Sequence, residues 1–206
     1  MKILGIDPGS AVTGFALVEA EGERVRLVDA GVLKPGRSGL FARRLADLSE
    51  ALERVVEEHE PDEAAVEDLF HAINAKSALK LAHARGVVLS VLARADVPVA
   101  EYTPLQVKKA VSGYGFADKG SVRALVEKLL GLESGLLALD ASDAAAVALC
   151  HAQSIPYRRA VLAAERGDRP RPRRERTAGA AAAETGADPA RPGRVAETNA
   201  HARRRP

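Results

Sequence analysis

Hydrophobic and polar residues in the first part of the chain follow the two-residue period of β-strands. Residues 2–6 alternate and branch like a buried strand, and residues 15–18 resume the pattern after a Pro8-Gly9 turn, which predicts a hairpin. The stretch VRLVDAGVLK, residues 25–34, predicts a third strand. Asp7 therefore falls where the first strand ends and the chain turns, a position at which polar side chains can face a cleft.

After these strands the apolar residues recur with the period of an α-helix. Between residues 41 and 56 they lie opposite a charged face, which predicts an amphipathic crossover helix that Pro61 stops. The pattern then predicts strands over residues 63–70 and 97–103, a long helix over residues 75–95, and helices up to residue 153. Three strands followed by alternating helices and strands predict an α/β fold, in which helices cover both faces of a mixed sheet.

The composition fits one folded domain with a tail. A chain of 206 residues with 47% hydrophobic residues can bury a core. The single Cys150 allows neither an internal disulfide nor a zinc cluster, which suits a reducing compartment. No basic and apolar leader precedes Ile3, and the longest apolar run, residues 144–150, is far shorter than the roughly 20 residues that cross a bilayer. We expect a soluble, cytoplasmic protein without membrane contact.

Charge divides the chain into two parts. From residue 157 onward the sequence has 13 Arg, no Lys and 6 acidic residues, so residues 157–206 carry +7 and residues 1–156 carry −5 of the overall +2. The later part is rich in Ala and Pro and poor in large apolar residues, which is typical of disorder. We predict a folded domain over residues 1–156 and a tail over residues 157–206, disordered beyond about residue 166. The tail is either a basic arm that binds nucleic-acid phosphates or an Arg-rich extension without a role in binding. Its acidic residues dilute the positive charge and slightly favour the second alternative.

Four acidic residues lie where predicted elements start or end. Glu67 ends a buried strand as Asp7 does, so two adjacent parallel strands would bring both carboxylates to one edge of the sheet. Asp140 and Asp143 lie three residues apart at the start of an apolar helix and share one of its faces. Clustered carboxylates repel one another unless divalent cations bind between them, and oxygen ligands without Cys or His select Mg²⁺ or Mn²⁺. The pattern indicates metal-dependent phosphoryl chemistry of the kind found in two-metal nucleases.

Each of these acidic residues also has a purely structural explanation. Asp140 can be the N-cap of the last helix, with Asp143 at its third position, and for this pair alone capping is the stronger explanation. Glu67 can be a charge on an edge strand, and Asp7 can form the Asx-turn of the Asp-Pro-Gly bend. Spacing alone leaves the structural and the functional interpretation open.

Four stretches of the sequence resemble the RuvC family of bacterial Holliday junction resolvases. They are ILGIDPGSAVTGFAL, AVEDLFHAINAKSALKLAHARGV, EYTPLQVKKAVSGYGFADK and LDASDAAAVALCHA, and together they span about residues 1–152 in the order of the family. The resemblance implies an RNase H-like fold with a mixed five-stranded sheet and a two-fold homodimer. It further implies a DNA endonuclease that resolves Holliday junctions by paired symmetric nicks in recombination and DNA repair, together with the RuvA and RuvB branch-migration proteins.

The resemblance also implies a set of metal ligands. Two Mg²⁺ ions per subunit, for which Mn²⁺ is a possible substitute, are held in the family by four acidic residues. By position, these ligands correspond to Asp7, Glu67, Asp140 and Asp143. Some members of the family have His at the position of Asp140.

Three further residues correspond to DNA contacts in the family. The junction-contacting phenylalanine falls on Phe70, and the two lysines near the scissile phosphate fall on Lys108 and Lys119. An exposed ring at Phe70 would stack on bases or wedge between them, whereas core packing is the ordinary explanation for a phenylalanine. Lysines at such positions either hold a phosphate as point charges or merely solvate the surface.

Residues 1–156 carry a net negative charge, which is unfavourable for binding DNA unless cations or basic side chains offset it near the acidic residues. Two divalent cations would nearly offset this charge of −5, and several basic side chains are candidates to gather beside the acidic residues. They are Lys76, Lys80, Arg85, Lys108, Lys109, Lys119 and Arg123.

The long helix predicted over residues 75–95 has apolar residues on all sides of its second half. They are Val87, Val88, Leu89, Val91 and Leu92. A sheet covers only one side of a helix, so a second covering surface is needed. That surface is either another helix of the same chain or the same helix of a second subunit, and the two-fold symmetry of a four-way junction favours a homodimer.

Three other functions share parts of this pattern. An actin-like ATPase or sugar kinase also begins with strand-Asp-x-Gly, but that architecture needs two such lobes, and no second glycine-rich nucleotide motif follows Glu67. A non-catalytic nucleic-acid binder would have no need of four acidic residues. Another RNase H-like nuclease, acting on RNA or on other branched DNA, would use the same metal chemistry, and the sequence distinguishes it poorly.

Overall fold

The structure is a computed structural model that describes residues 1–22, 24–36, 40–68, 75–113 and 119–165. All of these residues belong to one compact unit. The elements follow in the order β1 (Lys2–Asp7), β2 (Thr13–Glu21), β3 (Arg24–Leu33), α1 (Phe41–His59), β4 (Glu63–Glu67), α2 (Ala75–Arg94), β5 (Val99–Tyr102), α3 (Pro104–Ser112), α4 (Lys119–Leu129) and α5 (Leu139–Glu165). Among the described helices, none combines the length and the apolar character that a membrane span requires.

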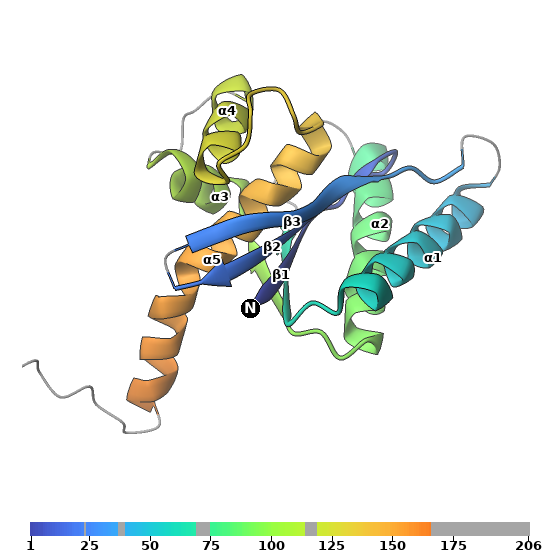
Figure 1. Cartoon of the computed structure of the whole chain (residues 1–206). Coiled ribbons are helices and arrows are strands. Elements are labelled where there is room, and N and C mark those ends of the chain that lie inside the picture. The colour runs from blue at the N-terminus through green and yellow to red at the C-terminus, as the bar shows by residue number, and fades with distance from the viewer. Residues whose placement is uncertain (23, 37–39, 69–74, 114–118, 166–206) are drawn as a thin grey trace, which may run out of the picture. The chain divides into compact units, whose positions relative to one another are not determined.

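The strands form one mixed sheet in the order β3-β2-β1-β4-β5. β2 pairs antiparallel with both β1 and β3, whereas β4 runs parallel to β1 and to β5. Figure 1 shows α1 and α2 on one side of this sheet and α3, α4 and α5 on the other. The predicted α/β fold, a mixed five-stranded sheet with helices on both faces, is therefore confirmed.

Strand alternation divides the core into two layers. On β1, Ile3 is buried with residues of α3, α4 and α5, whereas its neighbour Leu4 is buried with residues of α1 and α2. The same alternation holds on β2, where Ala16 and Leu17 belong to opposite layers. Successive side chains of a strand point to opposite faces, so a strand that is apolar at every position must be covered on both sides.

The start of α3 shows how local sequence sets an element boundary. The Thr103 side chain accepts a hydrogen bond from the backbone N–H of Gln106 at 3.3 Å, and the Gln106 Oε1 accepts one from the backbone N–H of Thr103 at 2.8 Å. This reciprocal capping box is followed by Pro104 at the first helical position, where no intrahelical donor is lost. Gly113 ends the helix in the left-handed conformation, with φ of 78°.

The five apolar residues in the second half of α2 are covered, fully or in part, by the same chain. Val88, Val91 and Leu92 are buried, and Val87 and Leu89 pack against the same layer of the core. The second covering surface is α1, which packs against α2 and adds its own buried residues to that layer. The alternative of a second helix from the same chain thus accounts for these five residues, and their burial does not require a second subunit.

The last helix is longer than the sequence pattern predicted. α5 continues beyond residue 153 to Glu165 and contains Pro156. A proline inside a helix removes one backbone donor, so it weakens one turn without necessarily ending the helix. Residues 166–206, for which disorder was predicted, lie outside the described residues.

A buried polar cluster joins α5 to the start of β4 and to the last residue of β5. His151 is fully buried, its Nε2 lies 2.8 Å from Glu63 Oε2, and its Nδ1 lies 2.8 Å from the Tyr102 hydroxyl. A neutral imidazole with its proton on Nε2 satisfies both contacts, because Nε2 then donates to Glu63 and Nδ1 accepts from Tyr102. Burial lowers the pKa of His151, partly opposed by Glu63 and reinforced by the nearby Arg158.

This cluster predicts that the free energy of unfolding falls in mild acid. The folded protein holds His151 neutral, whereas the unfolded chain protonates it near pH 6.5, so the stabilisation is present above that pH and is lost as the pH falls toward the lowered pKa. His151→Gln removes this titration, and urea unfolding at pH 7.5 and pH 5.5 should show a smaller pH effect in the variant. One histidine accounts for at most about 1.4 kcal/mol per pH unit. An equal pH effect in both proteins would contradict the prediction.

Candidate active site

The two strand-end acidic residues are neighbours at one edge of the sheet. β1 and β4 are adjacent and parallel, and Ile6 pairs with Val66, so Asp7 and Glu67 are the next residues of the two strands. Alternate residues of a strand share a face, so Asp7 lies on the face of Ile3, in the layer that α5 covers. Both acidic side chains are half-buried. The sequence-based expectation that the ends of these two strands meet is confirmed.

The first turn of α5 lies directly on the strand beside Asp7. Gly14 of β2 pairs with Asp7, and a Cβ atom at Gly14 would lie 1.9 Å from the carbonyl oxygen of Asp140. One turn later, a Cβ atom at Gly5 would lie 2.2 Å from the carbonyl oxygen of Ala144. Only glycine permits backbones to approach so closely, so these two glycines let the start of α5 rest on the sheet next to Asp7.

Asp140 is not the N-cap of α5. The carbonyl oxygen of Ala138 accepts the first hydrogen bond of the helix, from the backbone N–H of Ser142 at 2.8 Å, so Ala138 takes the N-cap position. Asp140 is the second residue of the helix, and Asp143 lies one turn further on. The capping explanation for Asp140 is therefore wrong in its position, although an acidic residue in the first turn still gains from the helix dipole. Both side chains are half-buried.

Backbone contacts bring the strand ends and the start of α5 together at this edge of the sheet, but the acidic side chains do not surround a common point. Within the described ranges, no three Asp, Glu, His or Cys side chains lie close enough together to hold a metal ion. Strand register brings Asp7 and Glu67 to one edge of the sheet, and the contact of α5 with Gly14 brings the first turn of that helix, which contains Asp140, beside Asp7. Their chemistry fits a hard divalent cation, because carboxylate oxygens are the ligands that Mg²⁺ prefers. Convergence of all four side chains on one site stays a prediction.

The predicted DNA contacts are described only in part. Phe70 lies outside the described residues. Lys108 is a half-buried residue of α3, and Lys119 is the first residue of α4. The proposed contacts of all three with DNA stay predictions.

Two of the basic residues proposed to gather beside the acids are paired within the protein. Arg85 of α2 forms ion pairs with Asp68, at 3.3 Å, and with Glu101. Arg123 of α4 forms an ion pair with Glu127 at 3.3 Å. Because these guanidinium groups are already paired with carboxylates of the protein, they are less available to bind a DNA phosphate. Of the other candidates, the side chains of Lys76, Lys80 and Lys109 are exposed.

Sequence patterns gave no indication of a contact between α1 and the loop that follows Asp7. The Arg44 Nη2 donates a hydrogen bond to the carbonyl oxygen of Ser10 at 2.7 Å, across 34 residues of sequence. In the sequence, Arg44 is one of several charged residues on the polar face of an amphipathic helix. Only the folded chain distinguishes it from its neighbours, because the contact depends on how α1 packs.

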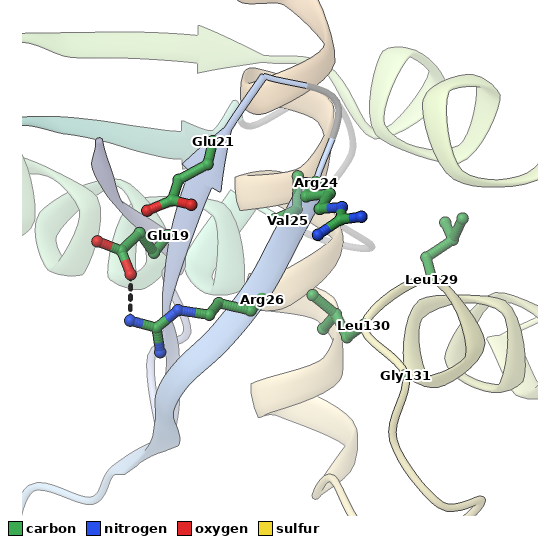
Figure 2. A pocket seen from close by; sticks show the side chains of 8 residues that line it. All are labelled: Glu19, Glu21, Arg24, Val25, Arg26, Leu129, Leu130 and Gly131. Carbon is green, nitrogen blue, oxygen red and sulfur yellow. Dashed lines mark hydrogen bonds and ion pairs between the residues drawn. The ribbon is translucent and has the colours of Figure 1, made fainter.

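A hollow of about 550 Å³ lies at the end of the β1–β2 hairpin that is opposite to Asp7 (Figure 2). Its walls come from β2, β3 and the end of α4, and they are formed by Glu19, Glu21, Arg24, Val25, Arg26, Leu129, Leu130 and Gly131. In this hollow Arg26 is paired with Glu19. Glu19 pairs with Lys2 at the start of β1, whereas Asp7 ends that strand, so the hollow is separate from the acidic edge.

The sequence matches the family model "Crossover junction endodeoxyribonuclease RuvC" over residues 3–151. A crossover junction endodeoxyribonuclease RuvC of Geobacter sulfurreducens is 49% identical over 154 residues, which cover 75% of this chain and 93% of that protein. The protein of the same name from Syntrophomonas wolfei is 45% identical over 154 residues, covering 75% of this chain and 90% of that protein.

Solved structures of Holliday junction resolvases are also similar to this chain. RuvC of Thermus thermophilus in complex with a Holliday junction substrate is 31% identical, with a TM-score of 0.69 over 76% of this chain and 96% of that chain. The yeast mitochondrial Holliday junction resolvase Ydc2 is 16% identical, with a TM-score of 0.56 over 73% of this chain and 77% of that chain, so it supports the fold alone. The family match covers the strands that end in Asp7 and Glu67 and the first turns of α5, and this chain belongs to the RuvC family of crossover junction endodeoxyribonucleases.

Proposed function

We propose that this protein is a metal-dependent endonuclease that resolves Holliday junctions by paired symmetric nicks, in recombination and DNA repair. The observation that carries the proposal is the edge at which Asp7, Glu67 and the first turn of α5 meet, in a chain of the RuvC family. The relatives at 45–49% identity are named crossover junction endodeoxyribonucleases, and a solved RuvC structure holds a Holliday junction substrate.

RuvC-family nucleases are metal-dependent. We propose that two Mg²⁺ ions per subunit are the cofactors here, that Mn²⁺ can replace them, and that Asp7, Glu67, Asp140 and Asp143 hold them. When bound, such cations lower the pKa of water and stabilise negative charge on a phosphodiester. The half-buried carboxylates would turn toward one another on binding, since in the structure no three of the described acidic side chains form a cage.

The protein's own residues have distinct parts in this proposal. Asp7 lies between Glu67 on β4 and Gly14 on β2, which contacts Asp140, so it is the central ligand of the four. Lys108 and Lys119 are proposed to hold the phosphate beside the scissile bond as point charges. Phe70 is proposed to engage the bases of the junction by stacking or wedging.

The proposed substrate has two equivalent strands, and a homodimer would present one active site to each. The exposed Leu79 on α2 is 61% accessible and offers apolar surface for such an interface. We also propose a cytoplasmic protein that works with the RuvA and RuvB branch-migration proteins. Residues 1–156 are proposed as the nuclease domain and residues 157–206 as a tail rich in Arg, Ala and Pro, with α5 continuing across that boundary to Glu165.

A four-way junction assay tests the proposal. The purified protein is incubated with a synthetic four-way junction, a fork and a linear duplex of the same sequence, with Mg²⁺ or with EDTA, and the nicks are mapped. We expect paired nicks at symmetric positions in two strands of like polarity, in the junction only and with Mg²⁺ only. Equal cutting of the duplex, or cutting in EDTA, would refute the proposal. Preferential cutting of the fork or of an RNA duplex would favour another RNase H-like nuclease activity.

A further inference from the structure

Glu127 is a buried acidic residue of α4 that the proposed active site does not use. Its side chain is 2% exposed. It accepts hydrogen bonds from the backbone N–H groups of Gly135, at 2.9 Å, and Leu137, at 3.0 Å, and from the Arg123 side chain at 3.3 Å. A carboxylate is seldom buried unless it is paired and hydrogen-bonded, and Glu127 meets both conditions.

These contacts hold the segment that leads into α5. α4 ends at Leu129 and α5 begins at Leu139, and the two backbone donors of Glu127 lie in the segment between them. The backbone carbonyl oxygen of Glu127 also accepts a hydrogen bond from the N–H of Leu132 at 2.8 Å. One residue of α4 therefore binds this connection at three points.

The charge of Glu127 strengthens this attachment. The backbone N–H groups of Gly135 and Leu137 and the nearby Arg123 lower the pKa of Glu127, so the group is ionised at neutral pH. Hydrogen bonds to an ionised acceptor are shorter and stronger than those between neutral groups. Leu137 is itself buried, at 6% exposed, so the segment is held by packing as well as by hydrogen bonds just before α5.

We propose that Glu127 is a positioning residue that sets the start of α5, and with it Asp140 and Asp143, for binding divalent cations. This inference rests on the proposed function, in which Asp140 and Asp143 are metal ligands. Leu137 lies three residues before Asp140, so a shift of the anchored segment moves the first turn of the helix. Mg²⁺ is small and demands near-octahedral ligand geometry, so a ligand displaced by even a fraction of an ångström coordinates it poorly.

The test compares three variants of the full-length protein. Glu127→Ala removes the acceptor, and Glu127→Gln keeps its shape but loses the charge and one acceptor oxygen. Glu133→Ala is the matched control, because it removes an exposed carboxylate from the same connecting segment. Binding of Mn²⁺ alone is measured by electron paramagnetic resonance of the free ion, and urea unfolding measures stability separately.

We expect the Mn²⁺ dissociation constant to rise about 10-fold in Glu127→Ala and less in Glu127→Gln, with no change in Glu133→Ala. The Mg²⁺ concentration for half-maximal junction cleavage should rise in parallel, and higher Mg²⁺ should restore the rate. Glu127→Gln keeps the test decisive if the alanine variant does not fold.

Two outcomes would overturn the inference in different ways. A purely structural Glu127 would lower stability in its variants and leave the Mn²⁺ affinity of the folded protein at the wild-type value, which refutes the positioning role alone. If the wild-type protein itself bound no Mn²⁺, the proposed metal site would fail, and the inference would fail with it.

Discussion

Asp7→Asn is expected to abolish junction cleavage while the protein still folds and binds the junction. Asn keeps the shape of Asp but loses the charge, so the central proposed ligand no longer attracts divalent cations. Metal ions contribute several kcal/mol to transition-state stabilisation, and the cleavage rate should therefore fall about 10³-fold or more. Single-turnover cleavage of a labelled four-way junction measures the rate, and an electrophoretic shift in EDTA measures binding.

The matched control for this variant is Glu57→Gln, which neutralises an exposed acid of α1. It should cut at the wild-type rate, because α1 covers the opposite face of the sheet from α5. Glu67→Gln should lose activity as Asp7→Asn does, since Glu67 is its neighbour on the parallel strand. Normal nicking by Asp7→Asn would show that the acidic edge is not the active site.

Gly14→Ala is expected to disable the enzyme without touching an acidic side chain. Its Cβ atom would lie 1.9 Å from the carbonyl oxygen of Asp140 and 2.5 Å from the carbonyl carbon. Both are backbone atoms that cannot rotate away, so the first turn of α5 must move away from the sheet. A displacement of about 1 Å at a catalytic group can cost about 100-fold in rate, and overpacking of this kind costs about 1–3 kcal/mol of stability.

Stability and site geometry are separated by Gly22→Ala, at the tip of the β2–β3 hairpin. Gly22 has φ of 62°, and among the described residues, its chain neighbours aside, no atom lies within 4 Å of the position that a Cβ would take. Alanine there is therefore strained by about 1–2 kcal/mol without a new clash with these residues. We expect urea unfolding to detect a loss of stability in both variants, and junction cleavage at 25 °C to fall only in Gly14→Ala. Equal cleavage by the two variants would mean that the start of α5 does not bear on the chemistry.

The strands and helices were predictable because their signals are local. The two-residue period of residues 25–34 and the helical period of residues 41–56 reflect which side chains are buried, whereas residues 3–6 form a continuous apolar run that is buried throughout. All three predicted elements are confirmed. The end of α5 was not predictable in the same way. Pro156 interrupts the local pattern, yet Arg158 beyond it contacts Glu63 at 3.4 Å and ties this part of the helix to the sheet. A contact across 95 residues leaves no periodic trace in the sequence.

The candidate site was predictable only as a set of positions. The sequence placed Asp7 and Glu67 at strand ends and Asp140 and Asp143 at a helix start, and these placements are confirmed. It did not decide whether Asp140 caps the helix, because that depends on which carbonyl accepts the first hydrogen bond of the helix, and metal binding by Asp140 stays a prediction. The structure assigns that carbonyl to Ala138.

By itself, the sequence of this protein determined the kind and order of its elements and the acidic residues at their ends, since burial periodicity and turn residues act over a few neighbours. Only the tertiary structure decided that β4 lies beside β1, that Gly14 receives the start of α5, and that Glu127 holds the segment before it. The physical reason is that these contacts join residues far apart in the chain. Their geometry depends on close packing of whole elements, to which no single stretch of sequence corresponds.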